Sequence, residues 1–353
     1  MTDFKSQNSM FLEWIFKITI VLVCLLTVFP NYYFIFNILI VGLLFLHYFV
    51  SCQNKIKHLD VLVLFFSIFQ VLISLDVSRI SIFIFYLFLR SKNLYNSRLL
   101  KKCLTIMFIF FVVILIAYSF GFNQENDLLS WSRVEQGFIE EKSLGFTNPN
   151  RCMLFFFIIS CLILLLTEKV RCYFFVFLTN IILYHFTQSR TYFYILILII
   201  FLLLFMKWRK KENTYSFIGK IVPWAFLGLG ILSVVLPYFF SDTYLNTLFT
   251  GRLVHNKEFL ETGITLFGNS ELETKTFDSS YLHMLLTKGA IYFVAFTILL
   301  FSYCKKTLIT NKKAIIIMAI FGAAFMEVIF LESFIMLLIG VIINYNKTER
   351  AFS

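Results

Sequence analysis

The chain has 353 residues, of which 59% are hydrophobic and 14% are charged, and its formal net charge is +11. Soluble domains contain about 45–50% apolar residues, so this composition leaves too little polar surface to cover a core and predicts a protein solvated by lipid. In a soluble protein the positive charge would suggest a nucleic-acid partner. Here the basic residues lie in short segments between apolar runs, and no nucleic-acid-binding motif is present, so that class is excluded.

Apolar runs follow one another along almost the whole chain. Each approaches the roughly 20 residues that a membrane-spanning helix needs. The runs are residues 11–29, 31–50, 59–75, 78–92, 101–120, 150–167, 170–187, 190–207, 217–239, 280–304, 313–329 and 331–345. We therefore expect an all-α, multi-pass membrane protein of about 12 helices, with a single transmembrane domain over residues 1–353. The first run has no small-residue cleavage site and is expected to remain in the protein.

The basic residues predict how the chain is oriented. If the N-terminus is cytoplasmic, every predicted inner loop is basic, as the positive-inside rule requires. These residues are Lys55, Lys57, Lys92, Arg98, Lys101, Lys102, Lys169, Arg171, Lys207, Arg209, Lys210, Lys211, Lys305, Lys306, Lys312, Lys313, Lys347 and Arg350. We expect a protein of the cytoplasmic (inner or plasma) membrane with both termini in the cytoplasm.

This orientation places two long loops, residues 121–149 and 241–279, on the extracytoplasmic face. Loops held by rigid helices are where functional sites are built, so an enzyme of the outer face is indicated more than a transporter. Within the second loop, Leu253 and Leu260 recur at helical spacing, and Ile264 and Phe267 continue the pattern. The sequence thus predicts a half-buried helix over 252–268, with Arg252, His255 or Asn256, and Phe259 on its opposite flank.

Five arginines on the predicted outer side are candidate ligands for an anion. Arg79, Arg151 and Arg190 stand at outer ends of apolar runs, and Arg133 and Arg252 lie in the two loops. The positive-inside bias works against arginine at such positions. One explanation is contact with lipid phosphate or a loop carboxylate, and the other is recognition of an anionic substrate. The planar guanidinium suits a diphosphate, because it donates two parallel hydrogen bonds.

A carboxylate and a histidine mark the start of the run 280–304. Asp278, Ser279 and Ser280 have the composition of a helix N-cap, while Asp278 at the membrane boundary would also serve as a general base. His283, one turn further on, would be a second base or a polar contact between helices, and we favour the contact. His255 is a weaker candidate.

No pattern in the sequence predicts a metal or a cofactor. The seven cysteines show no CxxC spacing, and the outer loops contain no Asp-Asp or Asp-x-Asp pair. Walker A, Rossmann, HExxH and GxSxG motifs are missing as well. We therefore expect a metal-independent reaction without a cofactor.

Several short motifs on the predicted outer side resemble, together with their order along the chain, those of the Wzy-type polysaccharide polymerases of O-antigen and capsule synthesis. They resemble the O-antigen ligases more distantly. Arg252 and Gly263 also have the spacing of arginine, ten residues, glycine described for that family. The motifs are Gly145-Phe-Thr-Asn-Pro-Asn150, Thr187-Gln-Ser-Arg-Thr191, Thr250-Gly-Arg252, Leu266-Phe-Gly268, Phe277-Asp-Ser-Ser-Tyr-Leu282 and Lys288-Gly289.

The resemblance implies a GT-C-like, all-helical glycosyltransferase acting on oligosaccharides carried by undecaprenyl diphosphate, with membrane lipid and a chain-length regulator as further partners. It implies that Arg190 and Arg252 bind the donor diphosphate. Asp278, chosen for its place at the membrane boundary and not through the resemblance, is the expected base. Asp278-Ser279 stands where ligases carry a His-Asn pair, which favours polymerase over ligase. The remaining candidate substrate-binding residues are Arg79, Arg133, Arg151, Asn148, Asn150, His255, Tyr281 and His283.

Two other functions remain open at this level. A ligase would transfer finished glycan to a different acceptor, and the sequence separates it poorly from a polymerase. A flippase for lipid-linked oligosaccharide would need charged residues in the middle of helices. Such positions are nearly free of charge here, with Lys17, Glu327 and Glu332 as the exceptions.

Overall fold

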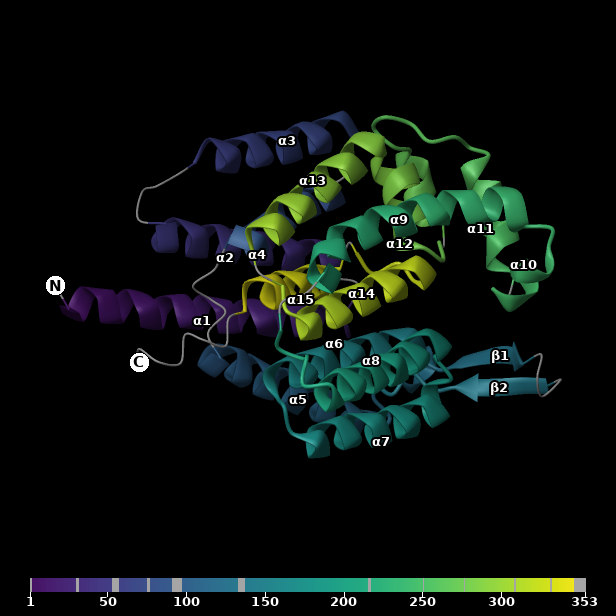
Figure 1. The fold of residues 1–353 in the computed structure, drawn as a ribbon, viewed down its shortest axis with the longest axis horizontal. Coiled ribbons are helices and arrows are strands. Elements are labelled where there is room, and N and C mark those ends of the chain that lie inside the picture. The colour runs from purple at the N-terminus through teal and green to yellow at the C-terminus, as the bar shows by residue number, and fades with distance from the viewer. Residues whose placement is uncertain are drawn as a thin grey trace. The chain divides into compact units, whose positions relative to one another are not determined.

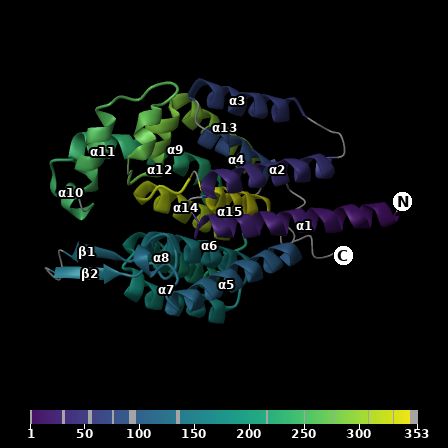
Figure 2. The same cartoon turned by 180° about the vertical axis from the view of Figure 1, so that it is seen from behind.

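The structure is a computed structural model that describes residues 2–29, 32–52, 57–74, 77–90, 97–132, 137–214, 217–249, 251–275, 277–307, 309–330 and 332–345. Within these ranges the chain forms fifteen α-helices and one antiparallel hairpin (Figures 1 and 2). The chain divides into two compact units. Unit 1 comprises Met1–Lys55, Arg90–Leu204 and Asn344–Ser353, and unit 2 comprises Ile56–Leu89 and Phe205–Ile343.

Unit 1 is built from six helices. They are α1 (Thr2–Leu26), α2 (Tyr33–Cys52), α5 (Ser97–Ser119), α6 (Pro149–Leu166), α7 (Val170–Thr187) and α8 (Arg190–Trp208). Helix α1 packs on α2 and α5, and α6 packs on α5 and α7. Both ribbon views show α5, α6, α7 and α8 running side by side (Figures 1 and 2).

The first predicted loop contains the hairpin, which departs from the expected all-α fold. Strand β1 (Leu128–Ser132) pairs with β2 (Gly137–Glu141). Asp127 holds the base of the hairpin, because its carboxylate accepts hydrogen bonds from the Tyr118 hydroxyl at 2.6 Å and from the Ser143 backbone N–H at 2.7 Å. Burial alone would raise the pKa of Asp127, but these hydrogen bonds outweigh it and lower that pKa.

Unit 2 contains nine α-helices and three short helical turns. They are α3 (His58–Ser74), η2 (Val77–Ile80), α4 (Ser81–Arg90), α9 (Phe217–Phe240), α10 (Tyr244–Leu248), α11 (Arg252–Leu260), η5 (Ser270–Thr274), α12 (Ser280–His283), the π-helical turn η6 (Met284–Lys288), α13 (Ala290–Lys306), α14 (Asn311–Met326) and α15 (Ser333–Asn344). Helix α9 packs on α11, α12, α13 and α14. Phe226 of α9 is fully buried and its ring lies 5.2–5.6 Å from the rings of Tyr281, Phe293, Phe296, Phe321 and Phe330.

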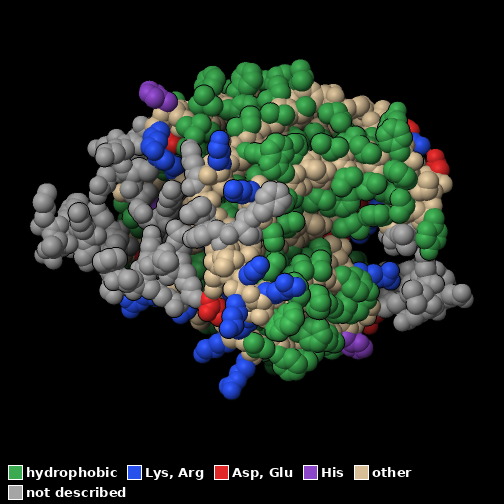
Figure 3. Space-filling view, in the orientation of Figure 1, with side chains coloured by type: hydrophobic (Ala, Val, Ile, Leu, Met, Phe, Trp, Pro, Cys, Tyr) green, Lys and Arg blue, Asp and Glu red, His purple; other side chains and the backbone are tan. Residues whose placement is uncertain are grey.

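Five helices in the described ranges are long and apolar enough to cross a membrane. They are α5, α6, α7, α8 and residues Ile218–Phe240 of α9. Large apolar side chains are exposed on α3 and α7, and Figure 3 shows such side chains spread over the helices on one face. Helices with this length and surface are those of a membrane protein, because lipid favours apolar side chains outside.

Several other predicted spans are short or interrupted. Helix α4 has ten residues, which at 1.5 Å per residue is about 15 Å, or half of a bilayer core. The predicted run 280–304 is divided into α12, the π-helical turn and α13, with a break at Gly289. Apolar composition does not reveal such breaks, because the residues on both sides remain buried.

A segment of the second loop forms backbone hydrogen bonds with the two sides of the break at Gly289. The backbone N–H of Asn269 donates to the carbonyl of Leu286 at 2.8 Å, and that of Ala290 donates to the carbonyl of Thr265 at 3.0 Å. Each group would otherwise be left without a partner at the end of a helix. The loop is therefore bonded to the broken helix backbone to backbone.

Arg79 forms further hydrogen bonds to both sides of this junction. Its side chain is 1% exposed. The guanidinium donates to the carbonyls of Phe267 at 2.5 Å, Thr287 at 3.0 Å and Lys288 at 3.2 Å, and to the side chain of Gln70 at 3.1 Å. One charged group thus compensates the carbonyl oxygens at both sides of the junction.

Replacing Gly289 with alanine should destabilise the protein by about 3 kcal/mol or more, because its φ of +95° is a glycine conformation and a Cβ would lie 2.4 Å from the nitrogen of Gly268. Gly263→Ala is the matched control: its φ is +86° but nothing lies within 4 Å, so a loss of about 1 kcal/mol is expected. Unfolding of the purified protein in detergent measures both. Equal losses would contradict the close backbone approach.

Candidate functional site

Arg252 and Asp278 meet in unit 2, at the end of α14. Arg252 begins α11, and its Nε lies 3.9 Å from Oδ1 of Asp278, which precedes α12. The Nη2 of Arg252 lies 3.5 Å from Oε1 of Glu327, and Nη1 donates to the carbonyl of Met326. The Arg252 side chain is 25% exposed, so the guanidinium lies between carboxylates with one side open to solvent.

Local sequence explains why α11 begins at this point. Gly251 takes a left-handed φ of +87° ahead of the helix, where glycine carries no steric penalty. The Asn246 side chain accepts from the N–H groups of Leu253 at 3.2 Å and Val254 at 3.3 Å, which caps the first turn. Arg252 is thereby fixed as the first helical residue.

The predicted helix over 252–268 is confirmed only as far as Leu260. Ile264 and Phe267 lie beyond its end, and Ile264 is exposed. Asn256, expected on the outer flank, is buried beside Leu253. The apolar spacing predicted a longer helix, but the chain turns after Leu260. It also predicted a polar outer flank at Asn256, whereas this asparagine faces inward.

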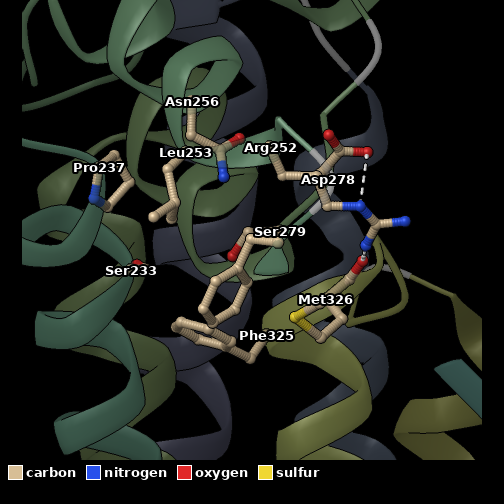
Figure 4. Close-up of a pocket in the computed structure, with 10 residues that line it drawn as sticks. Ser233, Pro237, Arg252, Leu253, Asn256, Asp278, Ser279, Phe325 and Met326 are labelled. Atoms are coloured by element: carbon tan, nitrogen blue, oxygen red, sulfur yellow. Dashed lines mark hydrogen bonds and ion pairs between the residues drawn. The ribbon is translucent and has the colours of Figure 1, made fainter. Parts of the chain in front are cut away.

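A small pocket lies against Arg252 and Asp278 (Figure 4). Helix α9 and α11 form its sides, and Phe325 and Met326 at the end of α14 close it from below. Its enclosed space is about 10 Å³, which holds one water-sized group. The lining residues are Ser233, Pro237, Phe249, Arg252, Leu253, Asn256, Asp278, Ser279, Phe325 and Met326.

The serines after Asp278 do not act as the N-cap that the sequence suggests. Ser279 holds the cap position of α12, but its side chain makes no capping hydrogen bond. Ser280 instead bonds to the segment that follows α14, donating to the Glu327 carbonyl at 2.6 Å and accepting from the N–H groups of Ile329 at 2.7 Å and Phe330 at 3.2 Å. Capping therefore does not account for Ser279.

A second charged cluster joins the same loop to α12 and the π-helical turn. Lys288 is fully buried and donates to Glu273 and Ser78. The Nε2 of His283 lies 3.6 Å from the other Glu273 oxygen. Burial alone would raise the pKa of Glu273, but the nearby His283 imidazole and the charge and hydrogen bond of Lys288 outweigh it and lower that pKa to about 2. His283 thus contacts the loop rather than another spanning helix.

The aromatic side chains of this loop and its helices close over a small apolar core. Leu272, Phe277, Leu282 and Leu286 form a buried cluster with Phe259 packed against it. The Phe259 and Phe277 rings are 4.4 Å apart. This packing and the Glu273 contacts together hold the segment that ends at Asp278.

The remaining candidates in unit 2 are largely engaged within the fold. Arg79 serves the loop junction described above. Tyr281 is fully buried and its hydroxyl donates to the carbonyl of Phe321 at 3.4 Å. His255 is half-buried on α11, with its Nδ1 3.8 Å from a carboxylate oxygen of Glu258.

The candidates in unit 1 lie on separate elements. Asn148 caps α6, because its side chain accepts from the Arg151 N–H at 2.8 Å, and Asn150 is exposed on the first turn. Arg190 is exposed at the start of α8 and belongs to unit 1, whereas Arg252 and Asp278 belong to unit 2. Arg133 lies outside the described residues.

Sequence analysis missed the role of Glu327. It was noted only as an exception among apolar spans, yet it binds Arg252. Asn256 was expected beside Arg252, and both do line the pocket, but Asn256 is buried where an outer flank was expected.

Glu273→Gln should lower stability at neutral pH, and the loss should shrink as pH falls from about 5 toward 3. The folded pKa lies below the ordinary 4.5, so the unfolded state takes up the proton first and the contribution of Glu273 is lost on acidification. Unfolding temperatures of the two proteins across this range test it. Glu261→Gln, at an exposed carboxylate, is the control; a loss independent of pH would contradict the ionic role of Glu273.

Comparisons with known proteins leave the interpretation to the chemistry of the site. The sequence matches no protein-family model, no curated protein and no solved structure. The pocket beside Arg252 and Asp278 is therefore interpreted from its own residues.

Proposed function

We propose that this protein is a Wzy-type polysaccharide polymerase. It would be an inverting, metal-independent glycosyltransferase that moves a growing glycan from undecaprenyl diphosphate onto a new lipid-linked repeat unit at the outer face of the cytoplasmic membrane. The observation that supports this most is the pairing of Arg252 with Asp278 beside a pocket in a helical membrane protein. A cation for a diphosphate and a carboxylate for a hydroxyl are the two groups that such a transfer needs.

In the proposed reaction the oxygen of an acceptor hydroxyl attacks the anomeric carbon of the donor glycan. The bond between that carbon and the diphosphate oxygen breaks, and its electron pair leaves with undecaprenyl diphosphate. The hydroxyl proton passes to the carboxylate of Asp278. A single displacement of this kind inverts the anomeric centre, and the guanidinium of Arg252 stabilises the charge that grows on the leaving group.

The contacts of Arg252 suit this role. Met326 and Glu327 each engage one terminal nitrogen, so the guanidinium is oriented before a substrate arrives. The distance of 3.9 Å between Arg252 Nε and Asp278 is too long for a hydrogen bond. Arg252 therefore does not occupy the carboxylate through a hydrogen bond at Nε, and the Asp278 side chain is 34% exposed, which leaves it accessible to a hydroxyl.

Asp278→Asn and Arg252→Ala should each slow polymerisation at least about hundredfold, because one removes the base and the other the charge stabilisation. The assay uses protein in liposomes with purified undecaprenyl-diphosphate-linked repeat units, and a ladder of products reports polymerisation. Lys257→Ala and Asp242→Asn are matched controls, since these residues form a 3.6 Å ion pair in the same loop, and both should keep the ladder.

Arg190→Ala tests the second arginine that the resemblance assigns to the donor diphosphate.

An undiminished ladder in Asp278→Asn and Arg252→Ala would remove both residues from the mechanism. Transfer of glycan only to a different acceptor would indicate a ligase, and movement of the lipid-linked unit without a new bond would indicate a flippase.

A further inference from the structure

Two buried polar atoms in the pocket beside Arg252 have no hydrogen-bond partner in the described part of the chain. They are Oδ1 of Asn256, a residue 7% exposed, and Oγ of Ser279, a residue 1% exposed. Both residues line the same pocket (Figure 4). Buried polar atoms in folded proteins are nearly always hydrogen-bonded, so two such atoms at one place need an explanation.

Structural roles do not supply it. Ser279 occupies the cap position of α12 without capping it, while its backbone carbonyl accepts from the His283 N–H at 2.9 Å. Asn256 lies on the buried face of α11 with Leu253, where an apolar residue would pack without an unsatisfied atom. Neither side chain is explained by the stability of the fold.

The chemistry of the two atoms defines what they would bind. The amide oxygen of Asn256 only accepts, whereas the Ser279 hydroxyl both donates and accepts. A hydroxyl is the group whose chemistry matches both atoms, because it has a hydrogen to donate to the amide oxygen and lone pairs to accept from the serine. The space of about 10 Å³ admits a group of that size. A phosphate or carboxylate oxygen carries no hydrogen to donate to the amide oxygen of Asn256, so a neutral hydroxyl fits the two atoms better.

We propose that Asn256 and Ser279 bind a hydroxyl of the acceptor sugar next to the one that reacts. This assignment rests on the proposed polymerase function. Ser279 follows Asp278 directly, and neighbouring hydroxyls of a sugar stand on adjacent carbons. One hydroxyl therefore enters the pocket while the adjacent one faces the Asp278 carboxylate. The two residues select the acceptor sugar and the hydroxyl that is glycosylated.

The test uses the full-length protein in liposomes, the native lipid-linked donor and acceptor repeat units on a short synthetic lipid. The acceptors carry the intact terminal sugar or lack one hydroxyl at a time. Ser279→Ala and Asn256→Leu should each raise the acceptor KM about tenfold and change kcat less, as the loss of one hydrogen bond predicts. One of the deoxy acceptors should raise the KM of the wild type by the same factor. With that acceptor, the KM of the variants should be no higher than the KM of the wild type.

A stability measurement separates binding from a structural role. Since neither atom has a hydrogen bond to lose within the described residues, the thermal stability of both variants should be unchanged or higher. Ser270→Ala, at an exposed serine of the same loop, is the control and should keep the acceptor KM.

Three results would overturn the assignment. An acceptor KM within about twofold of wild type in both variants, with a wild type that polymerises, would remove it and leave the polymerase proposal standing. A loss of stability that parallels the loss of activity would make the residues structural. No transfer by the wild type would overturn the polymerase proposal, and this assignment with it.

Discussion

The guanidinium of Arg252 joins three segments that are far apart in the sequence. Arg252 is the first residue of α11. Its guanidinium lies beside Asp278, ahead of α12, and contacts Met326 and Glu327 at the end of α14. A half-buried charge of this kind adds little net stability, because desolvation offsets the attraction. The charge instead specifies how the three segments are arranged, because the cation has its partners only when all three meet. The pocket exists where those segments meet.

Backbone contacts and a second set of charges hold the segment that leads to Asp278. Gly268 and Gly289 let the loop approach the broken helix, and Arg79 bonds to carbonyls on both sides. Glu273 then connects the loop to Lys288 and His283. Because these restraints are distributed over the loop, the fold itself positions Asp278. Preorganised polar groups are the condition for strong electrostatic stabilisation of charge.

The motifs that suggested the polymerase resemblance divide into two kinds. Gly145 packs its backbone against Ile114 of α5, while Gly268 and Gly289 form the loop junction, so these are positions of close backbone approach. Arg252 and Asp278 form the pocket rim, with polar groups open to solvent. Short motifs do not distinguish the two kinds, since glycine, serine and aspartate are also the ordinary residues of turns and caps.

Sequence alone determined that the chain is a helical membrane protein and that α11 begins near Arg252, because apolar length and helical periodicity are local properties. The hairpin at Leu128–Glu141, the interruption of the run 280–304 and the inward side of Asn256 were decided by tertiary structure. Each depends on a partner distant in the chain: a second strand, a loop with Gly268, and the wall formed by α9. The same holds for Glu327, whose pairing with Arg252 spans 75 residues. Such contacts follow from three-dimensional packing and leave no periodic pattern in the sequence.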